Sequence, residues 1–268
     1  MTTDHHLVLL RSRGISKRFG GVQALSDVSF TINHGEIYGL IGPNGAGKTS
    51  LFNVLTGIYA PDAGDFVFDG LPLAGSKPHE VAARGIARTF QNIRLFANLS
   101  ALENVMIGRH VRTTAGVWGA ILRDRRTRAE ERAIERRAFE LLEYVGVQRR
   151  ANDLAKHLAY GDQRRLEIAR ALATEPALLA LDEPAAGMNA SETLTLRKLL
   201  QDIRRDGTTI LLIEHDMKLV MSVCDRVLVL DYGKKIAEDT AREVQNDPKV
   251  IQAYLGGEVT LNLKGTVP

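Results

Sequence analysis

Several features that would define other protein classes are scarce in this sequence. The chain has a single cysteine, Cys224, which excludes an internal disulfide and a thiolate metal cluster, and we expect it to be a small buried side chain and not a reactive thiol. The longest apolar runs, residues 177–181 and 210–213, are far shorter than the roughly 20 residues that a membrane-spanning helix needs. The first residues, MTTDHH, do not have the pattern of a signal peptide, so we expect a chain that stays in the cytoplasm.

The sequence also has no large excess of positive or negative charge. The 35 Lys and Arg residues nearly balance the 32 Asp and Glu residues, and the two signs are interleaved over most of the length. Because a nucleic-acid-binding protein usually carries a denser basic patch, no nucleic acid is expected as a partner. In residues 123–137, the most basic stretch, acids stand at helical spacing from the bases, which is typical of a solvated helix face.

The 268 residues, 44% of them hydrophobic, are enough for a sizeable core, and their apolar pattern predicts an α/β fold. Strands are predicted at residues 28–32, 36–41, 65–70, 177–181, 208–214 and 226–238, the last range with a turn at Tyr232-Gly233. Between about residues 93 and 173 the pattern changes to helices with charged faces. We therefore expect a core with parallel βα units and a helical subdomain inserted into it.

The stretch GPNGAGKT, Gly42 to Thr49, matches the phosphate-binding loop pattern in full and lies between a predicted buried strand and a helix. Its glycines permit the tight turns that direct backbone N–H groups at phosphates, Lys48 supplies a positive charge, and the Thr49 hydroxyl is expected to bind Mg²⁺. A merely flexible glycine turn would explain the glycines but not Lys48 and Thr49 at this spacing.

Two acidic residues, Asp182 and Glu183, follow a predicted buried strand directly. A carboxylate in that position is costly unless it meets a cation, so Asp182 is interpreted as a Mg²⁺ partner and Glu183 as the group that polarises an attacking water. An acid that caps a helix near Ala185 is the weaker alternative. His215 also follows a buried strand and is expected at the γ-phosphate, although a histidine taken alone is more often structural.

The stretch HLAYGDQRRLEIARALA, residues 157–173, predicts a helix that begins at a glycine-containing turn. Such a helix start attracts anions, and Arg164 and Arg165 add positive charge to it. Nothing in the stretch could act chemically on a phosphate by itself, so its anionic partner is expected to come from elsewhere.

Taken together, these motifs resemble those of the ATP-binding cassette (ABC) proteins, and the resemblance covers nearly the whole chain. GPNGAGKTS is similar to the Walker A loop, RTFQNIRLF to the Q-loop, LAYGDQ to the signature motif, LLALDEP to Walker B, and LIEHD to the segment of the switch histidine. Five motifs in the family's order are highly specific. Phe19, in SKRFGG, stands where the family has an aromatic residue that stacks on adenine, and a core role is the alternative for it.

The resemblance assigns roles to individual residues. It implies ATP binding by Phe19, Gly42, Pro43, Asn44, Gly45, Ala46, Gly47, Lys48, Thr49 and Ser50. It implies catalytic roles for Gln91, Glu183 and His215, and Mg²⁺ ligation by Thr49, Gln91 and Asp182. The signature residues, which would contact the ATP of a partner cassette, are Ala159, Tyr160, Gly161, Asp162 and Gln163.

For the fold, the resemblance implies an ABC-type P-loop NTPase core with an antiparallel β subdomain and an inserted α-helical subdomain at about residues 93–173. A single ABC ATPase domain is expected over residues 1–257, followed by a C-terminal tail at 258–268. The implied ligands are ATP and Mg²⁺. The implied partners are a second cassette, two transmembrane permease subunits contacted near residues 92–104, and indirectly a periplasmic substrate-binding protein. The chain would then lie peripherally on the cytoplasmic face of the inner (plasma) membrane.

The signature departs from the family's common Ser-Gly-Gly-Gln, because Ala159 removes a hydroxyl that normally reaches the γ-phosphate, and Asn189 stands where an Asp is usual. The two ATP sites of the dimer would then differ, which favours a heterodimer, with a homodimer left open.

The residues of these motifs resemble the LivG-type ATP-binding subunits of high-affinity branched-chain amino acid importers more than they resemble cassettes at large. The insertion around residues 109–137, with Trp118, also fits that branch. Cassettes of urea or amide importers and of lipopolysaccharide exporters are the alternatives. A soluble ABC protein that acts on ribosomes or DNA would carry two cassettes or a long coiled coil, and a phosphate-loop kinase or GTPase would lack the signature.

Overall fold

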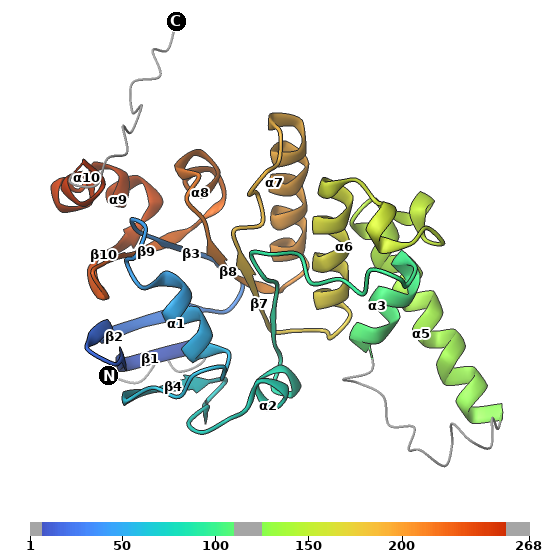
Figure 1. Ribbon diagram of the computed structural model, residues 1–268, viewed down its shortest axis with the longest axis horizontal. Helices are drawn as coiled ribbons and strands as arrows, with labels where there is room; N and C mark the ends of the chain where they lie inside the picture. The colour runs from blue at the N-terminus through green and yellow to red at the C-terminus, as the bar shows by residue number, and fades with distance from the viewer. Residues whose placement is uncertain (1–6, 110–124, 256–268) are drawn as a thin grey trace, which may run out of the picture. The chain divides into compact units, whose positions relative to one another are not determined.

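The computed structural model describes residues 7–109 and 125–255 (Figure 1). The contacts within the chain divide it into two compact units. The first unit is made by the chain up to residue 78 and from residue 209 onward, and the second by residues 79–208. Trp118 and most of the insertion predicted around it, together with the predicted tail at 258–268, lie outside the described residues.

An antiparallel sheet in the first unit has the strand order β2-β1-β4-β5. Its strands are β1 (Val8–Phe19), β2 (Val22–Asn33), β4 (Ala63–Phe68) and β5 (Leu71–Pro72). Buried residues alternate with more exposed ones along the second half of β2, as they do in a strand that packs one face on a core. The strand predicted at residues 28–32 is confirmed as part of β2, and the strand predicted at 65–70 as most of β4.

The remaining strands of the first unit lie in the order β10-β9-β3-β8. They are β3 (Ile37–Ile41), β8 (Thr209–Ile213), β9 (Arg226–Asp231) and β10 (Lys234–Thr240). β3 runs parallel to both β8 and β9, and every residue of β3 and β8 is buried. Their almost continuous apolar sequences are typical of strands covered on both faces. The helices of this unit are α1 (Lys48–Leu55), α8 (Met217–Val223), α9 (Ala241–Asn246) and α10 (Pro248–Leu255).

Cys224 packs in the core of the first unit. A Cβ atom added to Gly39 of β3 would lie 3.0 Å from its Sγ atom, so the thiol fills the space beside the strand. Burial raises the pKa of the Cys224 thiol, and the charges of Asp225 and Glu214 act in the same direction. The expectation of a buried, unreactive side chain is confirmed.

The second unit is mainly helical. Its described α-helices are α2 (Pro78–Ala83), α3 (Ala101–Arg109), α5 (Arg125–Tyr144), α6 (Tyr160–Leu172) and α7 (Ala190–Arg205). The first residue of α2, Pro78, still belongs to the first unit. Two short strands, β6 (Ile86–Arg88) and β7 (Leu178–Asp182), pair in parallel. Helix α6 packs against both α3 and α5. Helices are therefore found inside the range 93–173, as predicted, although residues 93–100 form no helix.

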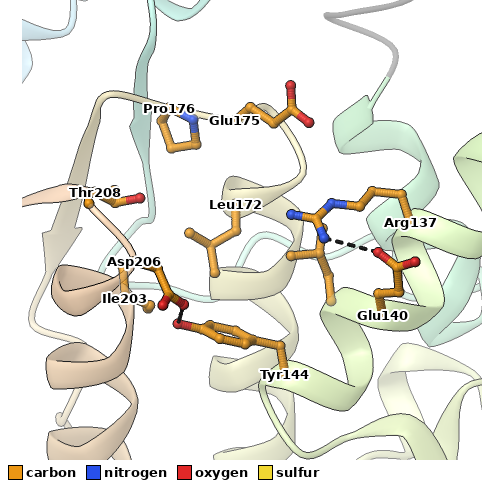
Figure 2. A pocket seen from close by; sticks show the side chains of 11 residues that line it. Arg137, Glu140, Tyr144, Leu172, Glu175, Pro176, Ile203, Asp206 and Thr208 are labelled. Atoms are coloured by element: carbon orange, nitrogen blue, oxygen red, sulfur yellow. Dashed lines mark hydrogen bonds and ion pairs between the residues drawn. The ribbon is translucent and has the colours of Figure 1, made fainter.

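A cavity of about 580 Å³ lies between α5, the end of α6 and the end of α7 (Figure 2). On its wall the Tyr144 hydroxyl donates a hydrogen bond of 2.7 Å to Asp206, and Arg137 pairs with Glu140. Within the part of the chain that the structure describes, no helix is both long and apolar enough to cross a bilayer.

Candidate functional site

The glycine-rich loop of the first unit connects β3 to α1. Gly42, directly after β3, has φ +151°, and a Cβ atom there would lie 2.1 Å from the carbonyl oxygen of Leu230. Gly47, the residue before α1, has φ +101°, and its Cβ would lie 2.6 Å from the carbonyl oxygen of Ala24. The close turns that the sequence predicts at these positions therefore need glycine for both space and conformation.

Helix α1 begins at Lys48, and the residue before it, Gly47, has no side chain that could cap the first N–H groups of the helix. The Lys48 ammonium group is buried and donates hydrogen bonds to the carbonyl oxygens of Gly42 (2.7 Å) and Pro43 (3.0 Å). Asn44, Gly45 and Thr49 are exposed. Loop amides, a helix N-terminus and a fixed ammonium group make this loop suited to an anion of several negative charges.

The turn between β9 and β10 is hydrogen-bonded to the glycine-rich loop. Tyr232 (φ +44°) and Gly233 (φ +76°) both lie in the left-handed region, as in the tight turns that join antiparallel strands. The Gly233 amide donates to the Ala46 carbonyl (2.9 Å), and the Gly233 carbonyl accepts from the Ser26 amide (2.8 Å). The turn was predicted from the sequence, but its contact with the loop was not.

Asp182 lies at the end of β7 in the second unit, and it is only 5% exposed. Its backbone amide donates to the Thr89 hydroxyl (3.3 Å), and its carboxylate lies 3.8 Å from the guanidinium group of Arg88. Burial lowers the pKa of Arg88 to about 10, while the nearby Asp182 carboxylate opposes that shift. The buried carboxylate therefore has a cationic neighbour, as the cost of burying a charge requires.

Glu183 and Gln91, two residues with predicted catalytic roles, are brought together in the second unit. The Gln91 side-chain amide donates a hydrogen bond of 2.9 Å to the Glu183 carboxylate. Glu183 has φ +47°, a conformation that costs a non-glycine residue roughly 1 kcal/mol and that is often found at functional sites. The chain thus turns sharply after Asp182 and directs the next carboxylate to Gln91.

The helix predicted in residues 157–173 is confirmed, but Gly161 lies in its first turn and not in a turn before it. Helix α6 begins at Tyr160, after Ala159, and no side chain caps it. The Asp162 carboxylate pairs with Arg165 (2.5 Å), and the Gln163 side chain donates to the Leu158 carbonyl (2.8 Å). The side chains of Asp162 and Gln163 are therefore bonded within their own segment. The groups at this helix start that attract an anion are the N-terminal backbone amides.

Phe19 and His215 belong to the first unit, and each is partly exposed. The Phe19 ring is 39% exposed and meets Tyr59 edge-on at a centroid distance of 5.1 Å. His215 lies two residues after the end of β8, next to Glu214, and its side chain is 62% exposed. Both side chains are thus accessible to a ligand, and their predicted contacts with adenine and with the γ-phosphate stay predictions.

Two residues gain a role that sequence reasoning missed. Asn189, which departs from the family pattern, caps α7. Its side chain accepts from the Glu192 amide (3.0 Å), and the Glu192 carboxylate accepts from the Asn189 amide (2.9 Å). The spacing Asn-x-x-Glu is a known signal for this reciprocal cap. Arg164 adds positive charge in the sequence, but its guanidinium group is buried, and it bonds the Tyr160 hydroxyl in its own helix and the Phe90 carbonyl of another segment.

The donor sets fit the predicted ligands. The loop amides and Lys48 fit phosphate groups, and the oxygen atoms of Thr49, Gln91 and Asp182 are of the kind that Mg²⁺ prefers. Among the described residues, no group of three or more His, Cys, Asp or Glu side chains could hold a metal ion by itself.

Two protein-family models match this chain. A family model described as "ABC transporter" matches residues 25–186, and one described as "Branched-chain amino acid ATP-binding cassette transporter" matches residues 234–260. The chain is 46% identical to the high-affinity branched-chain amino acid transport ATP-binding protein LivG of Salmonella typhimurium over 92% of its length and 98% of that protein.

The fold is also similar to those of solved structures, among them two ATP-binding cassettes. The first, the ADP conformation of an ATP-binding cassette of an ABC transporter, has a TM-score of 0.81 and 32% identity, and the match covers 93% of this chain and 99% of the other. The second, a dimeric structure of a post-hydrolysis state of an ATP-binding cassette bound to ADP and Pi, has a TM-score of 0.74 and 25% identity over 87% and 99% of the two chains. The expected cassette fold is confirmed, and the chain belongs to the ABC transporter family.

Proposed function

We propose that this chain binds and hydrolyses ATP with the residues described above and thereby powers the uptake of branched-chain amino acids through partner subunits. ATPase activity coupled to transport is the activity of its family. The contact between Gln91 and Glu183, one residue beyond the buried Asp182, is the observation that carries the proposal, because it pairs a candidate base with an amide that can orient it. The phosphate loop, complete from Gly42 to Thr49, supplies the binding half.

The triphosphate is held by the amides of the loop and the first turn of α1. The donors proposed are the amides of Gly45, Gly47, Lys48, Thr49 and Ser50. Pro43, Asn44 and Ala46 shape the loop, and the Ala46 amide donates to the Pro43 carbonyl (3.2 Å). Lys48 is positioned by its bonds to the Gly42 and Pro43 carbonyls and presents its charge to the phosphates. Phe19 offers a partly exposed ring on which adenine stacks.

Hydrolysis breaks the bond between the γ-phosphorus and the bridging oxygen as a water oxygen attacks in line. Glu183 orients that water and accepts its proton, while Gln91 holds the Glu183 carboxylate. His215 stabilises the charge that develops on the γ-phosphate. Mg²⁺, held by the oxygens of Thr49, Gln91 and Asp182, would neutralise phosphate charge when bound.

The N-terminus of α6 is proposed to meet the ATP of a second cassette, because its amides attract an anion while its own segment offers no group that acts on phosphate. A solved cassette dimer with 25% identity supports a dimeric arrangement. Since Ala159 lacks a hydroxyl, the site that it completes would be slower, which favours a different cassette as the partner.

Two permease subunits would contact the segment at residues 92–104, and a periplasmic substrate-binding protein would deliver the solute. The chain would lie peripherally on the cytoplasmic face of the inner membrane. Branched-chain amino acids are favoured as the solute by the family model that matches residues 234–260 and by the identity to LivG. No residue of this chain needs to touch the solute, so the choice of solute rests on these likenesses.

The test is the rate of ATP hydrolysis by the full-length chain over a wide range of protein concentration, alone and then with its cassette and permease partners. A low specific activity that rises with concentration or with the partners is expected, because each ATP site is completed by a second subunit. Full activity that is independent of concentration and of partners would contradict the composite site.

A further inference from the structure

Arg164 lies in the second turn of α6 with only 3% of its surface exposed. Its guanidinium group donates to the carbonyl oxygens of Phe90 (2.8 Å) and Gln91, which lie more than 70 residues away in the sequence. The same group donates to the Tyr160 hydroxyl from two nitrogens, at 3.1 and 2.8 Å. One side chain thus joins the signature turn to the segment that carries Gln91.

The segment around Gln91 is held largely by side chains from other parts of the second unit. The Arg94 amide donates to Glu167 (3.3 Å) and the Phe96 amide to Asn104 (2.9 Å), but Arg164 is the side chain that bonds the carbonyls of Phe90 and Gln91. Residues 89–99 contain no helix or strand, and the Gln91 side chain is exposed apart from its bond to Glu183. Without a ladder of backbone bonds, the carbonyls of Phe90 and Gln91 depend on a side-chain donor for their position. The planar fork of an arginine suits this task, because its several N–H groups point in fixed directions and bond two acceptors at once.

Tyr160 connects the same cluster to the segment after Glu183. A Cβ atom on Gly187 would lie 3.1 Å from the Tyr160 ring, so the ring packs directly on that glycine. The next residue, Gly161, lies so close to Glu192 that a Cβ atom would come within 2.7 Å of its carboxylate, the group that caps α7. The start of α6 is therefore packed against the chain that follows Glu183 as well as bonded, through Arg164, to Gln91.

We propose that Arg164 is a positioning residue that holds Gln91 against Glu183 and, through the Tyr160 hydroxyl, makes that position depend on the signature turn. This inference rests on the proposed function, in which Gln91 and Glu183 serve the ATP bound by this chain and the signature turn meets another ATP. A ligand that contacts the signature turn would then affect the position of Gln91 through the side chains of Tyr160 and Arg164.

The experiment is a double-mutant cycle on ATP hydrolysis by the full-length chain with its partner subunits, using Arg164→Lys and Gln91→Ala. Lysine keeps a positive charge near the buried Glu167 carboxylate, which lies 3.6 Å from Arg164. The donors of lysine all belong to one nitrogen atom, so it does not reproduce the planar guanidinium group, whose three nitrogens bond Tyr160, Phe90 and Gln91. Arg164→Lys should lower kcat by about 10-fold with little change in KM for ATP, and in the Gln91→Ala background it should lower kcat by less than about 2-fold.

The matched control is Arg165→Lys, one residue further along the same helix. Its guanidinium group bonds Asp162 and the carbonyls of Val145 and Gly146, none of which belongs to the Gln91 segment. The effects of Arg165→Lys and Gln91→Ala should therefore add. An Arg164→Lys effect of equal size in both backgrounds, or none at all, would overturn the proposal.

Tyr160→Phe keeps the ring on Gly187 and removes only the hydroxyl, so it provides the same cycle if Arg164→Lys fails to fold. It should lower kcat by about 3-fold, again not additively with Gln91→Ala, and leave the thermal midpoint nearly unchanged. The catalytic role of Gln91 is tested separately. If Gln91→Ala leaves kcat unchanged, Gln91 has no catalytic role. If Gln91→Ala lowers kcat strongly but the effects of Arg164→Lys and Tyr160→Phe add to it, only the positioning role is refuted.

Discussion

Replacing Gly42 with alanine should disable nucleotide binding, and the structure gives the reason in distances. An alanine Cβ at this position would lie 2.1 Å from the Leu230 carbonyl oxygen, whereas Cβ atoms essentially never approach another heavy atom closer than 3.0 Å. The loop and β9 must therefore separate by about 0.9 Å, on top of the roughly 1 kcal/mol that a positive φ costs an alanine. The carbonyl belongs to a buried strand and cannot rotate away.

A displacement of that size matters because the loop amides and Lys48 must point at the same phosphates. A misplacement of about 1 Å in a binding site can reduce rates by about 100-fold, so Gly42→Ala should lower kcat/KM for ATP by at least that factor. Gly20→Ala is the matched control: Gly20 also has a positive φ (+57°), but nothing lies within 4 Å of its Cβ position. It should cost about 1 kcal/mol of unfolding free energy and leave kcat/KM intact.

Equilibrium unfolding in urea and steady-state ATP hydrolysis on the same preparations separate the two effects. If Gly42→Ala kept kcat/KM within about 3-fold of the unsubstituted protein, the argument that this contact fixes the loop would be refuted.

Two further predictions concern the second unit. Asn189→Ala removes the reciprocal cap of α7 and should lower the unfolding free energy by about 1 kcal/mol in urea titrations, whereas Asn189→Asp, which keeps an acceptor, should cost little; equal costs would argue against the cap. Burial and the hydrogen bond to Asp206 raise the pKa of the Tyr144 phenol. This raised pKa contributes stability that is complete below the unfolded pKa of about 10 and is lost as pH rises above it. Tyr144→Phe should reduce the loss of stability between pH 9 and pH 11, and an unchanged pH profile would contradict the assignment.

The parts of the fold that follow from continuous apolar runs could be predicted. β3, β7 and β8 are buried on both faces, and their apolar sequences bounded by turn residues left few other interpretations. The turn at Tyr232-Gly233 was predicted for the same local reason. β1 was missed because its alternation is interrupted: Gly14 has φ +59°, and the pairing with β2 shifts register between Ser12 and Ile15.

The site was predicted as far as its motifs are local in the sequence. The phosphate loop, the acids after β7 and the start of α6 are each continuous stretches. The role of Arg164 could not be predicted, since its partners Phe90 and Gln91 lie 74 and 73 residues away and are joined to it only by the fold. The cap at Asn189 is local, because Glu192 follows three residues later at the spacing of a reciprocal cap, so this feature is readable from the sequence.

The central claim, that this chain hydrolyses ATP with Glu183 as the base, is tested most directly by Glu183→Gln, with ATP binding and hydrolysis measured on the same protein. Glutamine keeps the size and an acceptor near Gln91 but cannot take a proton, so binding should stay within about 3-fold while hydrolysis falls at least about 100-fold. Glu140→Gln, at an exposed position of α5, is the control and should change neither. Hydrolysis by Glu183→Gln at close to the unsubstituted rate would contradict the account.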